Sequence, residues 1–188
     1  MTDSTTPQTR VVVLLGSLRA TSYNRRIAER LRAEAPSGVT VDIATGLADL
    51  PFYNEELDAD AVPPAPRALR ELVSGADRVL AVTPEYNGTM PAVLNNAIDW
   101  LSRPYGMGAL KGKPFAVVGA TPTRSGGRWS HEDARRSATV AGADVVPDLL
   151  LSHSTLDADV FDDPDVFGRF LAALVALVEH QPVVDLAA

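Results

Sequence analysis

The chain has 188 residues, of which 46% are apolar, and this suits a single domain with a sizeable hydrophobic core. Its formal net charge of −7 argues against non-specific binding to nucleic acids, and the absence of cysteine excludes disulfides, thiolate nucleophiles and thiolate-ligated metals. The first nine residues are polar and unlike a signal peptide, and the longest apolar helical run, Phe170 to Val178, is too short to cross a bilayer. We therefore expect a soluble cytoplasmic protein without membrane or nucleic-acid partners.

Segments typical of strands and of helices alternate along the chain. The first strand-like run, Arg10 to Leu15, is β-branched without alternation, as in a strand buried on both faces of a parallel sheet. Five such strands and five helices predict a doubly wound parallel α/β sheet with helices on both faces. The predicted strands cover residues 10–15, 39–43, 77–82, 113–119 and 144–151, and the predicted helices cover residues 25–35, 67–74, 92–101, 130–142 and 165–180.

The domain is expected to cover residues 10–182, with a disordered tail over residues 1–9 and a short tail over residues 183–188. At the start of the fourth helix, Ser130 is expected to act as the N-cap, with Asp133 completing a loose capping box.

The loop after the third strand, Thr83 to Pro91, is the most informative stretch of the sequence. Pro84 and Pro91 stiffen its two ends, and Asn87-Gly88 predicts a tight turn with positive φ. Doubly wound sheets bind ligands beyond the carboxyl ends of their strands. A rigid loop at that edge can aim backbone N–H groups at a flat ligand.

The loop after the first strand, Gly16 to Asn24, has the composition of a phosphate site. It offers three Ser and Thr hydroxyl groups, the Arg19 guanidinium and the Asn24 amide, and it opens a helix whose N-terminus favours anions. It lacks the glycine triplet of dinucleotide sites and the Gly-Lys-Ser/Thr of a P-loop. The loop therefore fits a single monophosphate best. The alternative is that Ser22 or Asn24 only caps the helix and no phosphate binds.

The loop after the fourth strand is rich in Gly, Ser and Thr and ends near Trp129. Arg124 and Arg128 are open to two interpretations, a contact to the phosphate of NADPH or plain surface charge. The three histidines, His131, His153 and His180, lie far apart in sequence without ligand spacing, so we expect no metal site.

Taken together, these motifs resemble the NAD(P)H-dependent FMN reductase family, which includes bacterial quinone and chromate reductases. The resemblance implies a flavodoxin-like fold with strand order 2-1-3-4-5, one non-covalent FMN per subunit, NADPH or NADH as electron donor, and a homodimer or homotetramer. The matching elements are Gly16-Ser17-Leu18-Arg19 with Ser22 and Asn24, Asp49-Leu50-Pro51, Pro84-Glu85-Tyr86-Asn87-Gly88 with Pro91, Leu94, Asn96 and Asp99-Trp100, and Lys111-Gly112-Lys113-Pro114.

The resemblance carries over to individual positions. In the loop after the first strand, the resemblance implies contacts to the phosphate. In the Pro84–Gly88 segment it implies contacts along the isoalloxazine ring, and in the less similar loop after the fourth strand it implies contacts to the ring or the nicotinamide. The candidate cofactor-binding residues are Ser17, Arg19, Ser22, Tyr23, Asn24, Thr83, Pro84, Glu85, Tyr86, Asn87, Gly88, Thr121, Ser125 and Gly126.

The function expected is an oxidoreductase that passes electrons from NAD(P)H through FMN to flavin, a quinone or a similar small acceptor. The cofactor carries the hydride chemistry, so no side chain is nominated as a catalyst; Glu85 is open to a structural hydrogen bond or a subunit contact. A flavodoxin-type electron carrier without NAD(P)H activity is the alternative, and a relative that has lost its flavin is a third interpretation. Aromatic residues at Phe52, Tyr53 and Trp100, the last next to Arg103-Pro104-Tyr105, are expected to mark a subunit interface. The alternative is that they fold back on their own domain.

Overall fold

The computed structural model describes residues 8–59, 61–156 and 158–182. Within them, five parallel strands form one sheet in the order β2-β1-β3-β4-β5, which confirms the predicted flavodoxin-like topology. The strands are β1 (Thr9–Leu15), β2 (Val39–Ile43), β3 (Arg78–Val82), β4 (Pro114–Thr121) and β5 (Asp144–Ser154).

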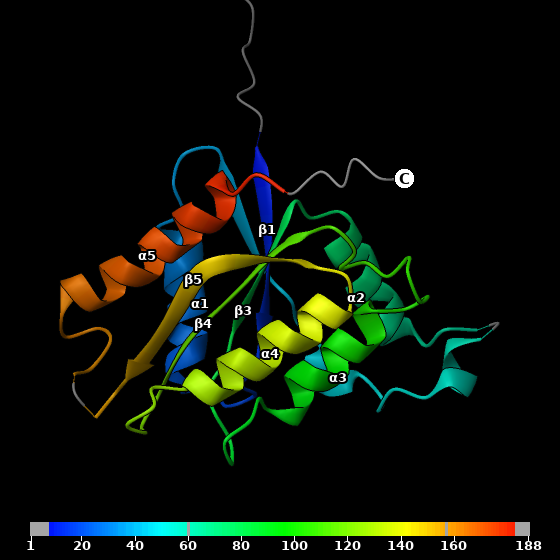
Figure 1. The fold of residues 1–188 in the computed structure, drawn as a ribbon, viewed down its shortest axis with the longest axis horizontal. Helices are drawn as coiled ribbons and strands as arrows, with labels where there is room; N and C mark the ends of the chain where they lie inside the picture. Colours follow the sequence, from blue (N-terminus) through cyan, green and yellow to red (C-terminus); the bar gives the residue numbers. More distant parts are fainter. Residues whose placement is uncertain (1–7, 60, 157, 183–188) are drawn as a thin grey trace, which may run out of the picture.

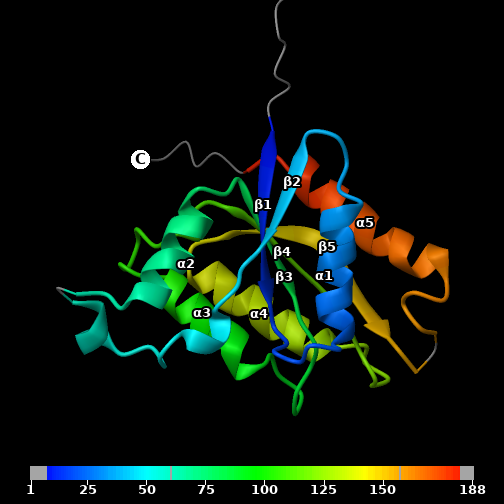
Figure 2. The ribbon, with the colours of Figure 1, turned by 180° about the vertical axis from the view of Figure 1, so that it is seen from behind.

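The helices cover both faces of this sheet, with α1 and α5 on one side and α2, α3 and α4 on the other (Figures 1 and 2). Two short 3-10 helices lie in the connection between β2 and α2. The helices are α1 (Tyr23–Ala33), α2 (Pro64–Ser74), α3 (Ala92–Leu101), α4 (Arg128–Val140) and α5 (Pro164–Glu179), and the 3-10 helices are η1 (Leu47–Asp49) and η2 (Glu55–Asp58).

The central strands divide the core into two halves. Successive side chains of a strand point to opposite faces, and in β1 Val12 and Leu14 pack beneath α2, α3 and α4, whereas Val11 and Val13 pack beneath α1 and α5. All four are fully buried. The apolar run without alternation is thus explained, because both faces of the strand are covered.

Several element boundaries differ from the sequence predictions. Helix α1 begins at Tyr23, earlier than predicted, because Ser22 is its N-cap and its Oγ accepts the Asn24 N–H at 3.2 Å. The predicted capping box at Ser130 and Asp133 is wrong, since α4 begins at Arg128 after Gly127 and Ser130 lies within its first turn. Thr9, assigned to the N-terminal tail, belongs to β1. Of the rest of the predicted tails, Gln8 is described and exposed, and residues 1–7 and 183–188 lie outside the described residues.

Candidate functional site at the carboxyl edge of the sheet

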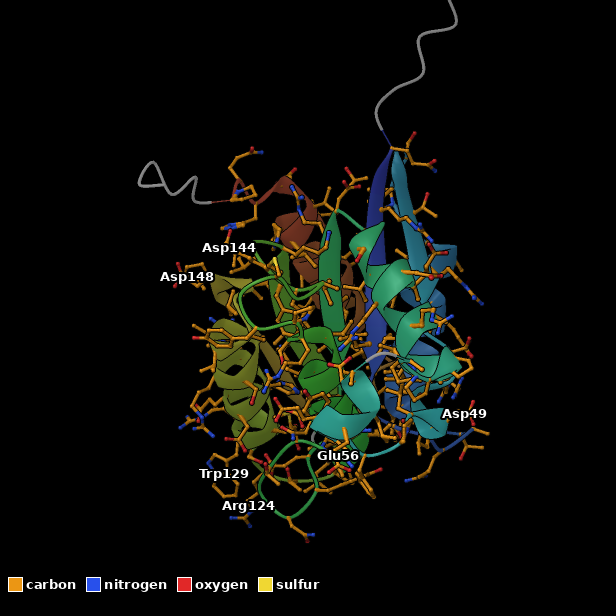
Figure 3. All side chains as sticks on the ribbon, turned by 90° about the vertical axis from the view of Figure 1, so that its right-hand side faces the viewer. Asp49, Glu56, Arg124, Trp129, Asp144 and Asp148 are labelled. Atoms are coloured by element: carbon orange, nitrogen blue, oxygen red, sulfur yellow. The ribbon has the colours of Figure 1, made fainter. Side chains whose placement is uncertain are left out.

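The loops that follow β1, β3 and β4 meet at one edge of the sheet, where the strand order reverses. The Gly16 N–H donates to the Val82 carbonyl at 2.9 Å, and a Cβ added at Gly16 would overlap the side chain of Thr83. Glycine at position 16 therefore allows the loop after β1 and the loop after β3 to touch. Figure 3 shows Arg124 and Trp129 at this edge with Asp49 and Glu56, and Asp144 and Asp148 at the opposite end.

The first loop presents a helix N-terminus and a free cation. Arg19 is exposed, and its guanidinium makes no ion pair with the acidic side chains of residues 8–59, 61–156 and 158–182. Ser17 is buried at the base of the loop, and Ser22 faces the first turn of α1 as its cap. This first turn contains no acidic residue, so its electrostatics favour an anion.

Two residues of the first loop that were predicted to bind the cofactor, Asn24 at its phosphate and Tyr23, have partners elsewhere in the chain. The Asn24 amide pairs with the backbone of Ala120, donating to its carbonyl at 2.8 Å and accepting its N–H at 3.0 Å. Tyr23 donates its hydroxyl to Asp159 at 2.9 Å, and this hydrogen bond raises the pKa of the Tyr23 phenol. Asn24 thus joins α1 to the end of β4, and Tyr23 joins α1 to the segment before α5.

The loop after β3 contains the predicted tight turn. Asn87 and Gly88 have φ values of 52° and 74°, and Tyr86 and Thr89 pair across them through N–H···O=C bonds of 3.0 and 3.1 Å. Positive φ at both central residues is the geometry of a type I′ turn, for which Asn-Gly is preferred. The N–H groups of Asn87 and Gly88 are not used by these two bonds, so the turn can offer them to a ligand.

The start of this loop is fastened to the first turn of α4. The Ser130 hydroxyl donates to the Pro84 carbonyl at 2.8 Å. Glu85 accepts the Trp129 N–H at 3.1 Å and the Ser125 hydroxyl at 3.2 Å. Of the two roles open to Glu85, a structural hydrogen bond or a subunit contact, these contacts are the first, and the Ser125 hydroxyl is directed at Glu85.

His131 lies behind this loop and is fully buried. Its Nε2 is 3.1 Å from the Thr83 carbonyl oxygen, which can only accept, so Nε2 carries the proton and donates. Nδ1 must then accept, and the Ser152 hydroxyl donates to it at 2.6 Å. Burial lowers the pKa of His131 from 6.5 to about 4, outweighing the opposite effect of the Thr83 bond.

The end of β4 brings these elements together at Gly119. A Cβ added there would overlap the Thr83 carbonyl oxygen and would lie 2.9 Å from both Asn24 Oδ1 and His131 Nε2. The close approach of four elements therefore requires glycine. Thr121 is buried at the same end of β4, and Gly126, with a φ of 62°, packs against the backbone of β5.

The comparisons with known proteins agree with this arrangement. A family model of NADPH-dependent FMN reductases matches residues 9–156. The chain belongs to the NADPH-dependent FMN reductase family. Among similar proteins, the quinone reductase of Pseudomonas putida is 46% identical over 171 residues, which cover 88% of this chain and 90% of that protein. A 2-hydroxy-1,4-benzoquinone reductase of a Burkholderia species is 36% identical over 156 residues, covering 80% of this chain and 83% of that protein.

A solved structure extends the likeness to three dimensions. FerB, a flavoenzyme NAD(P)H:(acceptor) oxidoreductase from Paracoccus denitrificans, matches with a TM-score of 0.77 and 30% identity, covering 92% of this chain and 98% of the other. Within the part of the chain that the structure describes, no helix has the length and apolar character needed to cross a bilayer.

Sequence reasoning missed three residues of this FMN reductase family member. His131 was considered only as a metal ligand, although its place in the first turn of a helix beside a loop was a usable signal. Trp129 is 54% exposed at the same edge, and a Cβ added at Gly88 would lie 3.5 Å from its ring. Arg25 borders a pocket of about 250 Å³ with Ser17, and its buried Nε has no hydrogen-bond partner among the described residues.

Two aromatic residues assigned to a subunit interface fold back on their own domain. Trp100 is fully buried, and its Nε1 donates to the Pro51 carbonyl at 2.8 Å. Tyr53 packs edge-on against Trp100, with ring centroids 5.0 Å apart. Phe52, by contrast, is 81% exposed.

Proposed function

We propose that this protein is an FMN-dependent NAD(P)H oxidoreductase that passes electrons to a quinone, a flavin or a similar small acceptor. The observation that carries the proposal is the convergence, at the switch point of the sheet, of an anion-favouring helix N-terminus and a rigid turn with two free N–H groups. FMN has a phosphate at one end and a flat ring at the other, and the two loops offer a partner for each. The family membership of the chain supports the same assignment.

The phosphate end is proposed to bind at the first loop. Arg19 would supply a charge-assisted, bidentate contact, and Ser17, Ser22 and the first N–H groups of α1 would supply the remaining donors. Asn24 would act through Ala120 by keeping α1 in place. The exposed position of Arg19 leaves its guanidinium available for this contact.

The ring is proposed to lie along the segment from Thr83 to Gly88, facing Thr121 and Gly126 across the edge of the sheet. FMN, when bound there, would supply the redox chemistry that links the nicotinamide to the acceptor. The protein holds and orients the ring, and the N–H groups of Asn87 and Gly88 can stabilise negative charge that develops on it. His131 is fully buried and has both nitrogens engaged, so no acid–base role is assigned to it.

The visible spectrum of the purified protein tests this proposal, followed by anaerobic addition of NADPH and NADH. We expect bound FMN and bleaching of the flavin band with at least one nucleotide. Bleaching that requires an added electron-transfer protein would support the flavodoxin-type carrier instead. The quinone reductases among its relatives favour quinones as the first acceptors to assay, and the dependence on NAD(P)H fits the cytoplasmic location expected from the sequence.

We further propose that the protein forms a homodimer or homotetramer through the face at the end of α3. Phe52, Tyr105 and Met107 are 81%, 87% and 74% exposed. Their segments are neighbours, because the Arg103 guanidinium lies 5.3 Å from the Tyr53 ring. Exposed aromatics that lie together mark interfaces. A second copy of the chain is the proposed occupant, and light scattering at micromolar concentration, with Tyr105→Ser as the disrupting variant, tests it; a monomeric wild-type mass would refute it.

A further inference from the structure

Helix α4 begins without a cap of its own. Its N-cap position is Gly127, with a φ of 98°, which provides no side-chain hydrogen bond, and its first turn contains no acidic residue. The first N–H groups of a helix have no partner within the helix, and here they lie at a partly buried edge of the sheet. The Arg128 N–H donates to the Ser125 carbonyl at 3.1 Å, and the next two N–H groups find their acceptor in another part of the chain.

Glu85 supplies it from the loop after β3. Its Oε2 accepts the N–H of Trp129 at 3.1 Å and that of Ser130 at 3.5 Å, and the Ser125 hydroxyl donates to Oε1 at 3.2 Å. Glu85 is only 9% exposed and forms no ion pair with the cationic side chains that the structure describes. A carboxylate at the positive end of the helix dipole is favourably placed.

Two further contacts join the residues just before Glu85 to the residues just after Trp129. The Pro84 carbonyl accepts from the Ser130 hydroxyl, and the Thr83 carbonyl accepts from His131 Nε2. Three consecutive residues of the loop thus pair, in reverse order, with three consecutive residues of α4. A single contact would let the loop pivot, whereas three successive contacts fix its position relative to the helix.

We propose that Glu85 is a positioning residue that fixes the ring-facing loop by capping α4 and takes no part in proton transfer. This inference rests on the proposed function, because the flavin ring is what the loop would hold. Without the cap, the loop and the first turn of α4 become mobile together, and flavin binding must then order both. FMN and riboflavin share the ring, so their affinities fall by the same factor.

The test compares Glu85→Ala with Glu85→Gln, whose side-chain oxygen can still accept the two N–H groups. Glu132→Ala is the matched control, because Glu132 lies in the same part of α4 but has a half-exposed side chain that forms a surface ion pair with Arg128. Without flavin, hydrogen exchange followed by NMR should show the Trp129 and Ser130 amides at least about tenfold less protected in Glu85→Ala. Because flavin binding must then order the loop and the first turn of α4, both flavin dissociation constants should rise about tenfold or more.

Glu85→Gln should retain most of the amide protection and, when saturated with FMN, turn over at nearly the wild-type rate with an unchanged pH profile. Unchanged amide protection in Glu85→Ala would overturn the inference, as would lost protection with unaltered affinity for both flavins. A large loss of turnover in flavin-saturated Glu85→Gln with an altered pH profile would instead indicate proton transfer. A wild-type protein that binds no flavin would overturn both the proposed function and the positioning role. The exchange measurement needs no flavin, so it shows separately whether Glu85 caps α4.

Discussion

Acidification is predicted to destabilise the protein through His131. The folded state holds this imidazole neutral, fully buried and hydrogen-bonded at both nitrogens. In the unfolded chain the same group has its ordinary pKa of 6.5, whereas in the folded state burial lowers the pKa to about 4. As the pH falls from 6.5 towards 4, the unfolded chain takes up a proton that the folded protein does not, and the free energy of unfolding decreases.

The size of the effect follows from the two pKa values. Each unit of pKa corresponds to about 1.4 kcal/mol, so the fall from 6.5 to about 4 amounts to about 3 kcal/mol. This contribution is fully present above pH 6.5, is lost between pH 6.5 and 4, and changes no further below pH 4, where both states carry the proton. Against a typical free energy of unfolding of about 5–15 kcal/mol, a loss of this size is easily measured.

Urea unfolding at pH values between 7.5 and 4 measures this loss. Other groups titrate in the same interval, so the informative quantity is the difference between wild type and His131→Gln. A glutamine amide can donate to the Thr83 carbonyl and accept from Ser152, but it does not titrate. We expect the wild type to lose about 3 kcal/mol more than the variant on acidification. Parallel curves for the two proteins would refute the reasoning, because His131 would then have the same pKa in both states.

Three further substitutions test other parts of the site, and a fourth, on α5, is the control for one of them. Arg19→Ala should weaken FMN binding by about ten- to a hundredfold and leave riboflavin binding unchanged, as measured by fluorescence quenching; an equal loss for both flavins would mean that Arg19 only holds the loop. Asn24→Ala leaves the buried backbone of Ala120 without partners and should cost about 2–4 kcal/mol in urea unfolding, with the preference for FMN over riboflavin retained. Gly119→Ala should lower the free energy of unfolding by at least about 2 kcal/mol, or prevent folding, because its Cβ has no space. Gly168→Ala, in open space on α5, should raise the free energy of unfolding by up to about 1 kcal/mol, as measured by thermal unfolding.

Much of the fold could be predicted because its signals are local. The apolar run of β1 and the helical spacing of Ile27, Ala28 and Leu31 depend only on near neighbours in the chain. The tight turn at Asn87-Gly88 was also predicted correctly, since positive φ is a property of those two residues themselves. The phosphate contacts of Ser17 and Arg19 remain predictions, and the first turn of α1 favours them electrostatically.

Two of the errors share one cause, which is that a side chain's partner depends on where the fold places it. Ser130 has the residue type of a helix cap, but its hydroxyl is used by the Pro84 carbonyl. Trp100 looked like an interface aromatic, but the segment at Pro51 folds over it. In both cases the competing partner is far away in the sequence, and no local pattern indicates it.

By itself, the sequence determined the alternation of strands and helices, the loops that meet at the switch point and the resemblance to a family. Each of these depends on short stretches of residues that are close together in the chain. Only the tertiary structure decided how those loops are held. The partner of Glu85 lies 44 positions away at Trp129, and that of Asn24 lies 96 positions away at Ala120. Such pairs form only after the strands have assembled, since it is the order of strands in the sheet that brings their carboxyl ends, and the helices after them, into contact.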